Sequence, residues 1–230
     1  MAAQLLSKSY LLFGDCTDLI TLSFNDVVKS FQPPEFVIGQ YVEQAGNPIA
    51  ENRGISITSN KRRTTIRIVP NRIEILVEGI KPDFDQEMKY LVALVNISKK
   101  KFNRIAIHQT AVINDSDDKT KKDMAKKVLG RSFDNNSIND FSFRINEIKR
   151  VSKEEINAIS SINSGFVQNF IVKNNVAYPN LSNALFFNTD INTSQKNLVE
   201  RFDENYVVDM FSKLEEINAK TMESLIKSCE

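Results

Sequence analysis

Histidine is almost absent from this chain of 230 residues, because His108 is the only one. A histidine-rich metal site is therefore excluded, and any Ser-His-Asp or Cys-His nucleophilic site would have to use this one residue. The chain contains no Gly-x-Ser-x-Gly sequence, and its seven glycines leave little material for a glycine-rich phosphate loop. No Walker A, dinucleotide-binding or zinc-spacing motif occurs. We predict no catalytic residue, no metal and no cofactor, which favours a non-enzymatic protein and leaves the enzyme question open.

Cysteine is also scarce, with Cys16 near one end of the chain and Cys229 near the other. Two cysteines in these places do not make a disulfide framework, so we expect a reducing compartment. No apolar run approaches the length of a membrane span, and Lys8 and Asp15 interrupt the segment that otherwise resembles a lipoprotein cleavage site. These features predict a cytoplasmic protein that has no membrane partner.

An excess of either charge is lacking as well, since 30 Lys and Arg stand against 29 Asp and Glu and give a net charge of +1. A chain so close to neutral has no global field that would attract nucleic acid or an anionic membrane. Any such binding would need a local patch of charge.

Residues 55–113 form the most complete structural unit in the sequence. Apolar and polar residues alternate at period two in three short segments, which predicts antiparallel strands at 55–57, 64–69 and 72–78. Apolar residues then recur at the spacing of one helix face over residues 84–95, and alternation resumes in a fourth strand at 103–113. The unit is therefore a meander with a helix lying on its sheet.

The segments around this unit are assigned from the same local signals. Before it, the sequence predicts two strands joined through a turn at Gly14-Asp15, a third strand and a loop, at residues 5–13, 19–24, 36–42 and 45–54. After it, Ser116 caps a helix that ends before Gly130, and further strands are predicted at 141–148, 165–172 and 185–191. Residues 154–163 are ambiguous between strand and helix, and Asp203 begins the longest amphipathic helix.

The second half of the chain thus repeats the order of the first half, with strands followed by a long helix. We predict an α+β protein of two similar lobes, each an antiparallel meander followed by a long helix, and the two lobes can share one sheet. The boundary is placed at the start of a polar, asparagine-rich segment, which gives lobes 1–131 and 132–230 unless the chain is one continuous domain.

Five basic residues cluster in sequence around the central strands: Lys61, Arg62, Arg63, Arg67 and Arg72. Arginines on a strand ribbon can contact phosphate, so the cluster is a candidate site for nucleic acid. No aromatic residue interleaves it for stacking on bases, and acidic residues of the adjacent strand offer cross-strand partners. A solvated hairpin or an acidic protein partner is therefore favoured over nucleic acid.

Polar residues mark a second candidate site on the sheet. Alternation places His108, Thr110 and Arg67 on the side opposite the apolar residues of their strands. Asp190 ends a later predicted strand. One histidine beside an arginine could perform general acid–base chemistry on an anionic substrate in a cleft between the lobes. The favoured alternative is that His108 pairs with Glu74 or Glu78 in a sheet that only rests against the other lobe.

Residues 64–78 with the helix that follows, and residues 185–191 with the helix from Asp203, resemble a sporadically distributed bacterial family of uncharacterised proteins of similar length. In that family, the strand before the last helix carries an acidic Leu-Asp-Ile-Asp-like element and the helix carries a Leu-His pair. Asn188-Thr-Asp190 partly fits the first element, whereas Ile217-Asn218 stands in the place of the second without its histidine. The resemblance implies a role in conflict with phage or rival cells and implies no activity.

We therefore predict a non-enzymatic protein-interaction module, such as a bacterial immunity, antitoxin or phage-defence subunit that binds a partner protein. Two alternatives stay open, a nucleic-acid-binding subunit that uses the basic hairpin 61–72 and an enzyme with a site around His108. Self-association into a homo-oligomer also stays open.

Overall fold

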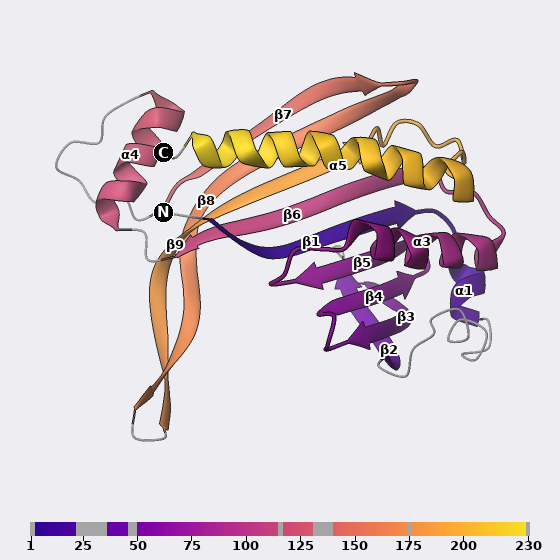
Figure 1. The fold of residues 1–230 in the computed structure, drawn as a ribbon, viewed down its shortest axis with the longest axis horizontal. Coiled ribbons are helices and arrows are strands. Elements are labelled where there is room, and N and C mark those ends of the chain that lie inside the picture. Colours follow the sequence, from indigo (N-terminus) through magenta and orange to yellow (C-terminus); the bar gives the residue numbers. More distant parts are fainter. Residues whose placement is uncertain are drawn as a thin grey trace.

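The computed structural model describes residues 3–21, 36–45, 50–114, 117–130, 140–173 and 176–228 (Figure 1). The strands are β1 (Gln4–Phe13), β2 (Val37–Ala45), β3 (Ala50–Ser59), β4 (Thr64–Val69), β5 (Arg72–Glu78), β6 (Arg104–Asn114), β7 (Ser142–Val151), β8 (Glu154–Lys173) and β9 (Val176–Thr193). The helices are α1 (Thr17–Thr21), α3 (Phe84–Ser98), α4 (Asp118–Leu129) and α5 (Glu204–Lys227).

The nine described strands form one antiparallel sheet in the order β2-β3-β4-β5-β1-β6-β9-β8-β7. β1 and β6 pair with each other at the middle of the sheet, although they are far apart in the chain. Strands from both halves of the sequence therefore belong to the same sheet, and the predicted α+β fold is confirmed.

Helices α3 and α5 lie on the same face of this sheet (Figure 1). Strand residues at alternate positions point into the helix layer, and fully buried examples are Ile66, Ile68, Ile105 and Ile107. The alternation predicted for these strands is confirmed, because a strand turns successive side chains to opposite faces. The residues between them point to the other side of the sheet, which we call the open face.

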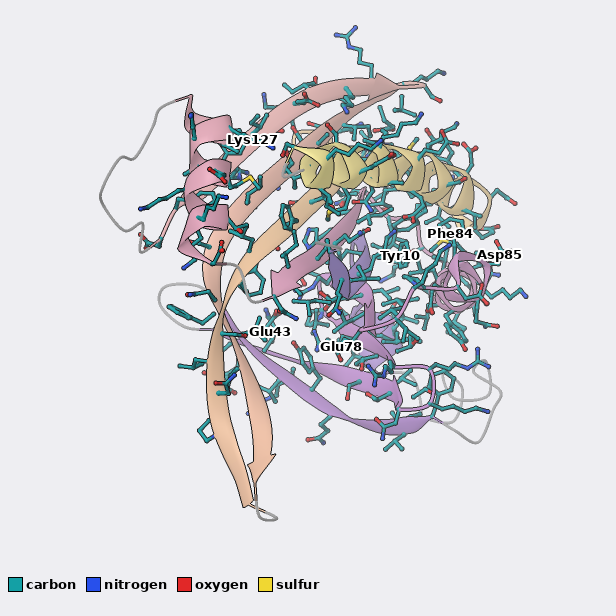
Figure 2. All side chains as sticks on the ribbon, turned by 60° about the vertical axis from the view of Figure 1, so that its left-hand side comes forward. Tyr10, Glu43, Glu78, Phe84, Asp85 and Lys127 are labelled. Atoms are coloured by element: carbon teal, nitrogen blue, oxygen red, sulfur yellow. The ribbon has the colours of Figure 1, made fainter. Side chains whose placement is uncertain are left out.

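Tyr10 of β1 connects both helices to the sheet. Its ring lies 6.0 Å from the ring of Phe84 on α3 and 5.9 Å from that of Phe211 on α5, and both contacts are edge-to-face (Figure 2). Burial of Tyr10, with the negative charges of Glu215 and Glu87, raises the pKa of its hydroxyl above the ordinary value. The core is thus centred on the strand that also occupies the middle of the sheet.

Side-chain caps are present at the starts of α3 and α5, and the latter lies at Asp203, where the sequence predicts the helix to begin. Asp83 caps α3 by accepting a hydrogen bond from the Gln86 N–H, and Lys99 ends it in the left-handed conformation. Asp203 caps α5 by accepting from the N–H groups of Asn205 and Tyr206. Such side-chain acceptors satisfy backbone donors that have no partner inside the helix.

Several sequence predictions for single segments are wrong. Residues 19–21 of the segment predicted as strand 19–24 belong to α1, because Asp15 accepts a hydrogen bond from the Thr17 N–H and starts a helix there. Residues 22–24 lie outside the described ones. The hairpin predicted at Gly14-Asp15 does not form, since both edges of β1 are taken by β5 and β6. Residues 50–54 of the predicted loop belong to β3 and pair with β2.

The ambiguous segment 154–163 is a strand, and it joins the predicted strand 165–172 in the long β8. Likewise, β9 extends well before the predicted start at residue 185. The cap predicted at Ser116 and the boundary between residues 131 and 132 lie outside the described residues, and Asp117 caps α4. None of the helices in the described ranges is long and apolar enough to cross a membrane.

Candidate functional site

The open face carries a row of polar side chains that crosses the middle of the sheet. His108 on β6 stands directly opposite Ser9 on β1 and directly opposite Asp190 on β9. Ser9 in turn donates a hydrogen bond of 3.1 Å to Glu74 on β5. Strand pairing therefore aligns polar groups from β1, β6 and β9, and a diagonal side-chain hydrogen bond adds Glu74 of β5.

The pair of His108 and Asp190 is the best-defined part of this row. His108 Nε2 lies 3.1 Å from Asp190 Oδ1, and the same oxygen accepts a hydrogen bond of 2.8 Å from Asn192 Nδ2. Burial by itself raises the pKa of the Asp190 carboxyl, but the hydrogen bonds from His108 and Asn192 and the charge of Arg104 outweigh it and lower the pKa. A histidine oriented by a carboxylate is the arrangement that general-base sites use.

The prediction that His108 pairs with Glu74 or Glu78 is wrong. Both glutamates are on β5, and β1 lies between β5 and β6 in the sheet. Glu74 is instead engaged by Arg67, whose Nη1 lies 3.3 Å from Glu74 Oε2. The order of the strands, which local patterns do not encode, decides which carboxylate reaches the histidine.

A small hollow of about 220 Å³ lies over this pair, lined by His108, Thr110, Ile159, Ser161, Asn188 and Asp190 among others. The three residues of the predicted polar site, His108, Thr110 and Asp190, therefore lie together. Thr110 donates a hydrogen bond of 3.0 Å to Asn188 Oδ1. Sites for drug-sized ligands measure roughly 300–1,000 Å³, so this hollow suits only a small ligand.

The five residues of the basic cluster are not brought into one patch. Lys61, Arg62 and Arg63 lie in the turn between β3 and β4, whereas Arg72 begins β5 at the opposite end of β4. Arg72 Nη2 lies 2.6 Å from Glu43 Oε1 on β2, and both side chains are largely buried. With Arg67 held by its glutamate, two of the five cations already have an acidic partner within the chain.

A buried asparagine on α5 escaped the sequence prediction. Asn218 is fully buried, accepts a hydrogen bond of 2.6 Å from Thr189 Oγ1 on β9 and donates one of 2.6 Å to Gln109 Oε1 on β6. The signal was present in the sequence, because Asn218 lies four residues from Leu214 and four from Met222 on the apolar stripe. A polar residue at such a position needs partners across the interface, so it fixes how α5 lies on the sheet.

The β8–β9 hairpin extends far beyond the rest of the sheet (Figure 1). β7 pairs with β8 only as far as Asn163, and β6 pairs with β9 only as far as Ala184. Residues 166–173 and 176–183 therefore pair only with each other, and we call them the β8–β9 arm. Eight residues of strand correspond to about 25 Å of projecting ribbon.

Helix α4 packs at the base of the β8–β9 arm. The buried Lys121 donates a hydrogen bond of 2.9 Å to Asn183 Oδ1, and its Nζ lies 5.8 Å from the centre of the Phe166 ring. Phe166 nevertheless remains 64% exposed, and Leu181 is 66% exposed. The arm therefore presents large apolar side chains to solvent just beyond the helix that supports it.

Comparison with known proteins adds no family to these observations. A scan against models of known protein families and a search of curated proteins both found no match. Within the described ranges, no three His, Cys, Asp or Glu side chains gather in a way that could hold a metal ion.

Proposed function

We propose that this protein is a non-enzymatic module that binds a partner protein through the β8–β9 arm. The observation that carries the proposal is the exposure of Phe166 and Leu181 on one side of the arm. Phe166 is opposite Asn183, two residues from Leu181, so alternation turns all three side chains to the same side. The expected partner has an apolar cleft that receives this side of the ribbon.

The energetics of an isolated ribbon favour such a partner. A two-stranded ribbon is only marginally stable in water, because it lacks a layer that covers its apolar side chains. Burying one large apolar side chain stabilises a contact by about 1.5–3 kcal/mol, so Phe166 and Leu181 together can act as the centre of an interface. Exposed apolar groups of this size are otherwise a liability for a protein that folds alone.

Site-specific photocrosslinking in the native host tests the proposal. A photoreactive amino acid at position 181 should capture one discrete protein, because the arm inserts into it. The matched control is the same amino acid at position 198, since Leu198 is 76% exposed but lies outside every described strand and helix. The Phe166→Ser change should abolish the capture without lowering the melting temperature. Equal labelling from both positions, or capture that survives Phe166→Ser, contradicts the proposal.

We further propose that the module is a subunit of a bacterial immunity, antitoxin or phage-defence system. The support is the resemblance carried by residues 64–78 and 185–191, together with a net charge close to zero, which suits a protein partner better than a polyanion. A toxin or nuclease gene beside this one, whose product is the protein captured at position 181, is the expected finding. A captured housekeeping protein encoded elsewhere would remove the defence role and leave the binding role standing.

A small-ligand site at His108 is the second candidate function. The observation in its favour is the 3.1 Å contact between His108 and Asp190 beside a hollow of about 220 Å³. Replacing His108 by Gln keeps a side-chain amide in place of the ring and removes proton transfer at neutral pH. Loss of biological activity with an unchanged melting temperature would favour this candidate, and full activity would eliminate it.

We also propose that the chain consists of two similar lobes. In the first half, β1 and α1 are followed by the meander of β2, β3, β4 and β5 and then by α3, and β5 pairs with β1. In the second half, from residue 132 onward, the meander of β7, β8 and β9 is followed by α5, and β9 pairs with β6 of the first half. Separate expression of residues 1–131 and 132–230, with a test for reassociation, would examine this division.

A further inference from the structure

Strand β7 forms one edge of the sheet, and its outer side pairs with no other strand in the described part of the chain (Figure 1). Ile148 at its centre is 65% exposed, and Ile145 is also exposed. An open edge carries unpaired N–H and C=O groups, which makes it a template for another strand. The sequence of β7 identifies which strand fits.

The hairpin between β7 and β8 determines which backbone groups of β7 face outward. A two-residue turn, Ser152-Lys153, joins the strands, and Val151 stands opposite Glu154 as the closing pair. In such a hairpin the closing pair is hydrogen-bonded, and bonding then alternates along the strand. The N–H and C=O groups of Ile148 and of residues 146 and 150 therefore point away from β8 and are free to bond another chain.

We propose that two copies of this chain associate through antiparallel pairing of β7 with β7, centred on Ile148. A twofold axis perpendicular to the sheet then places Ile148 opposite Ile148 of the other copy and joins the two sheets into one. The remaining pairs of this register are Glu147 with Lys149, Asn146 with Arg150, and Ile145 with Val151. The dimer uses β7, which lies outside the β8–β9 arm, so this inference does not depend on the partner-binding proposal.

Charge complementarity selects this register among the symmetric ones. With Ile148 at the centre, each Glu147 meets a Lys149 of the other copy, and symmetry repeats the pair. A register centred on Glu147 would place this carboxylate opposite itself and Arg144 opposite Arg150, and a register centred on Asn146 would place Glu147 opposite Ile145. Opposite charges in directly facing positions stabilise a strand pair, and like charges destabilise it.

The side chains of this edge are accessible to a second copy. Within one copy, Lys149 Nζ lies 3.3 Å from Glu147 Oε2, and both side chains are exposed. They border a hollow of about 420 Å³ that is also lined by Lys127 of α4 (Figure 2) and by residues of α5. In the dimer, the two pairs combine into a square of alternating charges on the helix side of the joint sheet, while the two Ile148 side chains bury each other on the open face.

Charges on an edge strand also serve in many proteins to prevent pairing. Here the charge-reversal variants Glu147→Lys and Lys149→Glu separate the two roles. Each single variant places like charges opposite each other twice, so its dimer dissociation constant should rise at least about tenfold. An equimolar mixture of the two variants restores opposite charges at both positions and should form a heterodimer, and the double variant should form a homodimer.

Sedimentation velocity of the full chain over a concentration series measures the wild type, the two single variants, their mixture and the double variant. Lys89→Glu is the matched control, because Lys89 is an exposed cation on α3 and its reversal should leave the dimer intact. Circular dichroism and melting temperatures identify a variant that fails to fold, and the double variant keeps the test decisive in that case. A wild-type chain that stays monomeric at every concentration overturns the proposal, and so does a mixture that forms no more dimer than the separate single variants.

Discussion

Replacing Glu87 by Gln should make the stability of this protein nearly independent of pH between mildly acidic and mildly alkaline conditions. Glu87 lies on α3 and is buried, facing the sheet rather than solvent. Thr64 Oγ1 donates to its Oε1 over 3.5 Å, while Oε2 is buried and has no hydrogen-bond partner in the described part of the chain. Burial with so few hydrogen bonds raises the free energy that ionisation of this carboxyl group requires.

Burial raises the pKa of Glu87 from 4.5 to about 7, and Thr64 and Arg62 only partly oppose the rise. The folded state therefore binds the proton more tightly than the unfolded chain does. Below the unfolded pKa both states are protonated and nothing is lost, whereas stability falls as the pH rises from the unfolded pKa to the folded one. A shift of this size corresponds to about 3 kcal/mol at 1.36 kcal/mol for each unit of pKa.

Urea denaturation followed by circular dichroism, near pH 5 and near pH 8, measures the effect. The free energy of unfolding of Glu87→Gln relative to wild type should increase by about 2.5 kcal/mol between the two pH values, because Gln resembles the protonated acid and a small part of the loss already occurs below pH 5. Asp85→Asn is the control, since it removes an exposed carboxylate from the same helical turn (Figure 2). A relative stability of Glu87→Gln that changes by less than about 1 kcal/mol over this range would refute the reasoning.

Three further predictions follow from other contacts. Gly54→Ala should destabilise the fold by about 1–3 kcal/mol, because a Cβ there would lie 2.0 Å from a backbone oxygen of β4. Gly39→Ala on the next strand is the control. Its Cβ would meet nothing closer than 3.6 Å, so this variant should be as stable as wild type in the same urea assay. Asn218→Ala should reduce the free energy of unfolding by about 2 kcal/mol, since it removes the partner of the buried Thr189 and of the half-buried Gln109. An unchanged denaturation midpoint would contradict this role. In a Cys229→Ser background, Cys16 should resist thiol reagents near pH 8 until urea is added, because burial raises its pKa to about 12. Fast labelling of the native protein would contradict this prediction, since it would show that the thiol is accessible.

Local sequence patterns predicted the elements of this fold better than their arrangement. β4 and β5 have the predicted limits, because alternation at period two and the turn at Pro70-Asn71 are properties of adjacent residues. α5 likewise begins after its predicted cap, Asp203. The order of the strands could not be predicted in this way, since β1 is placed between β5 and β6 by pairings that span most of the first half of the chain.

The candidate sites show the same difference: local patterns predicted which residues share a face, but not which strands lie side by side. His108, Thr110 and Asp190 were grouped from alternation and from the predicted end of a strand near Asp190. β9 continues to Thr193, and the three side chains lie together on the open face. The carboxylate that contacts His108 was assigned wrongly, because sequence distance suggested β5 and the fold supplies β9. The arm was not predicted. Local patterns indicate a strand at 165–172, but they do not show that this strand and its partner extend beyond the neighbouring strands of the sheet.

The central position of β1 also determines the order in which the protein can fold during synthesis. β1 leaves the ribosome before the other described strands and can pair with β5 before β6 has been made, so the nascent chain can build the sheet only from one side. Until residues 104–114 emerge, the other edge of β1 is open. Tyr10 and Leu12 stay uncovered for longer, until α5 emerges and packs on them. α5, which is translated after every described strand, thus completes the core around β1, which is translated before the others. We therefore expect slow folding and aggregation of incomplete chains. We expect nascent chains that end before α5 to require chaperones, although they contain most of the sheet.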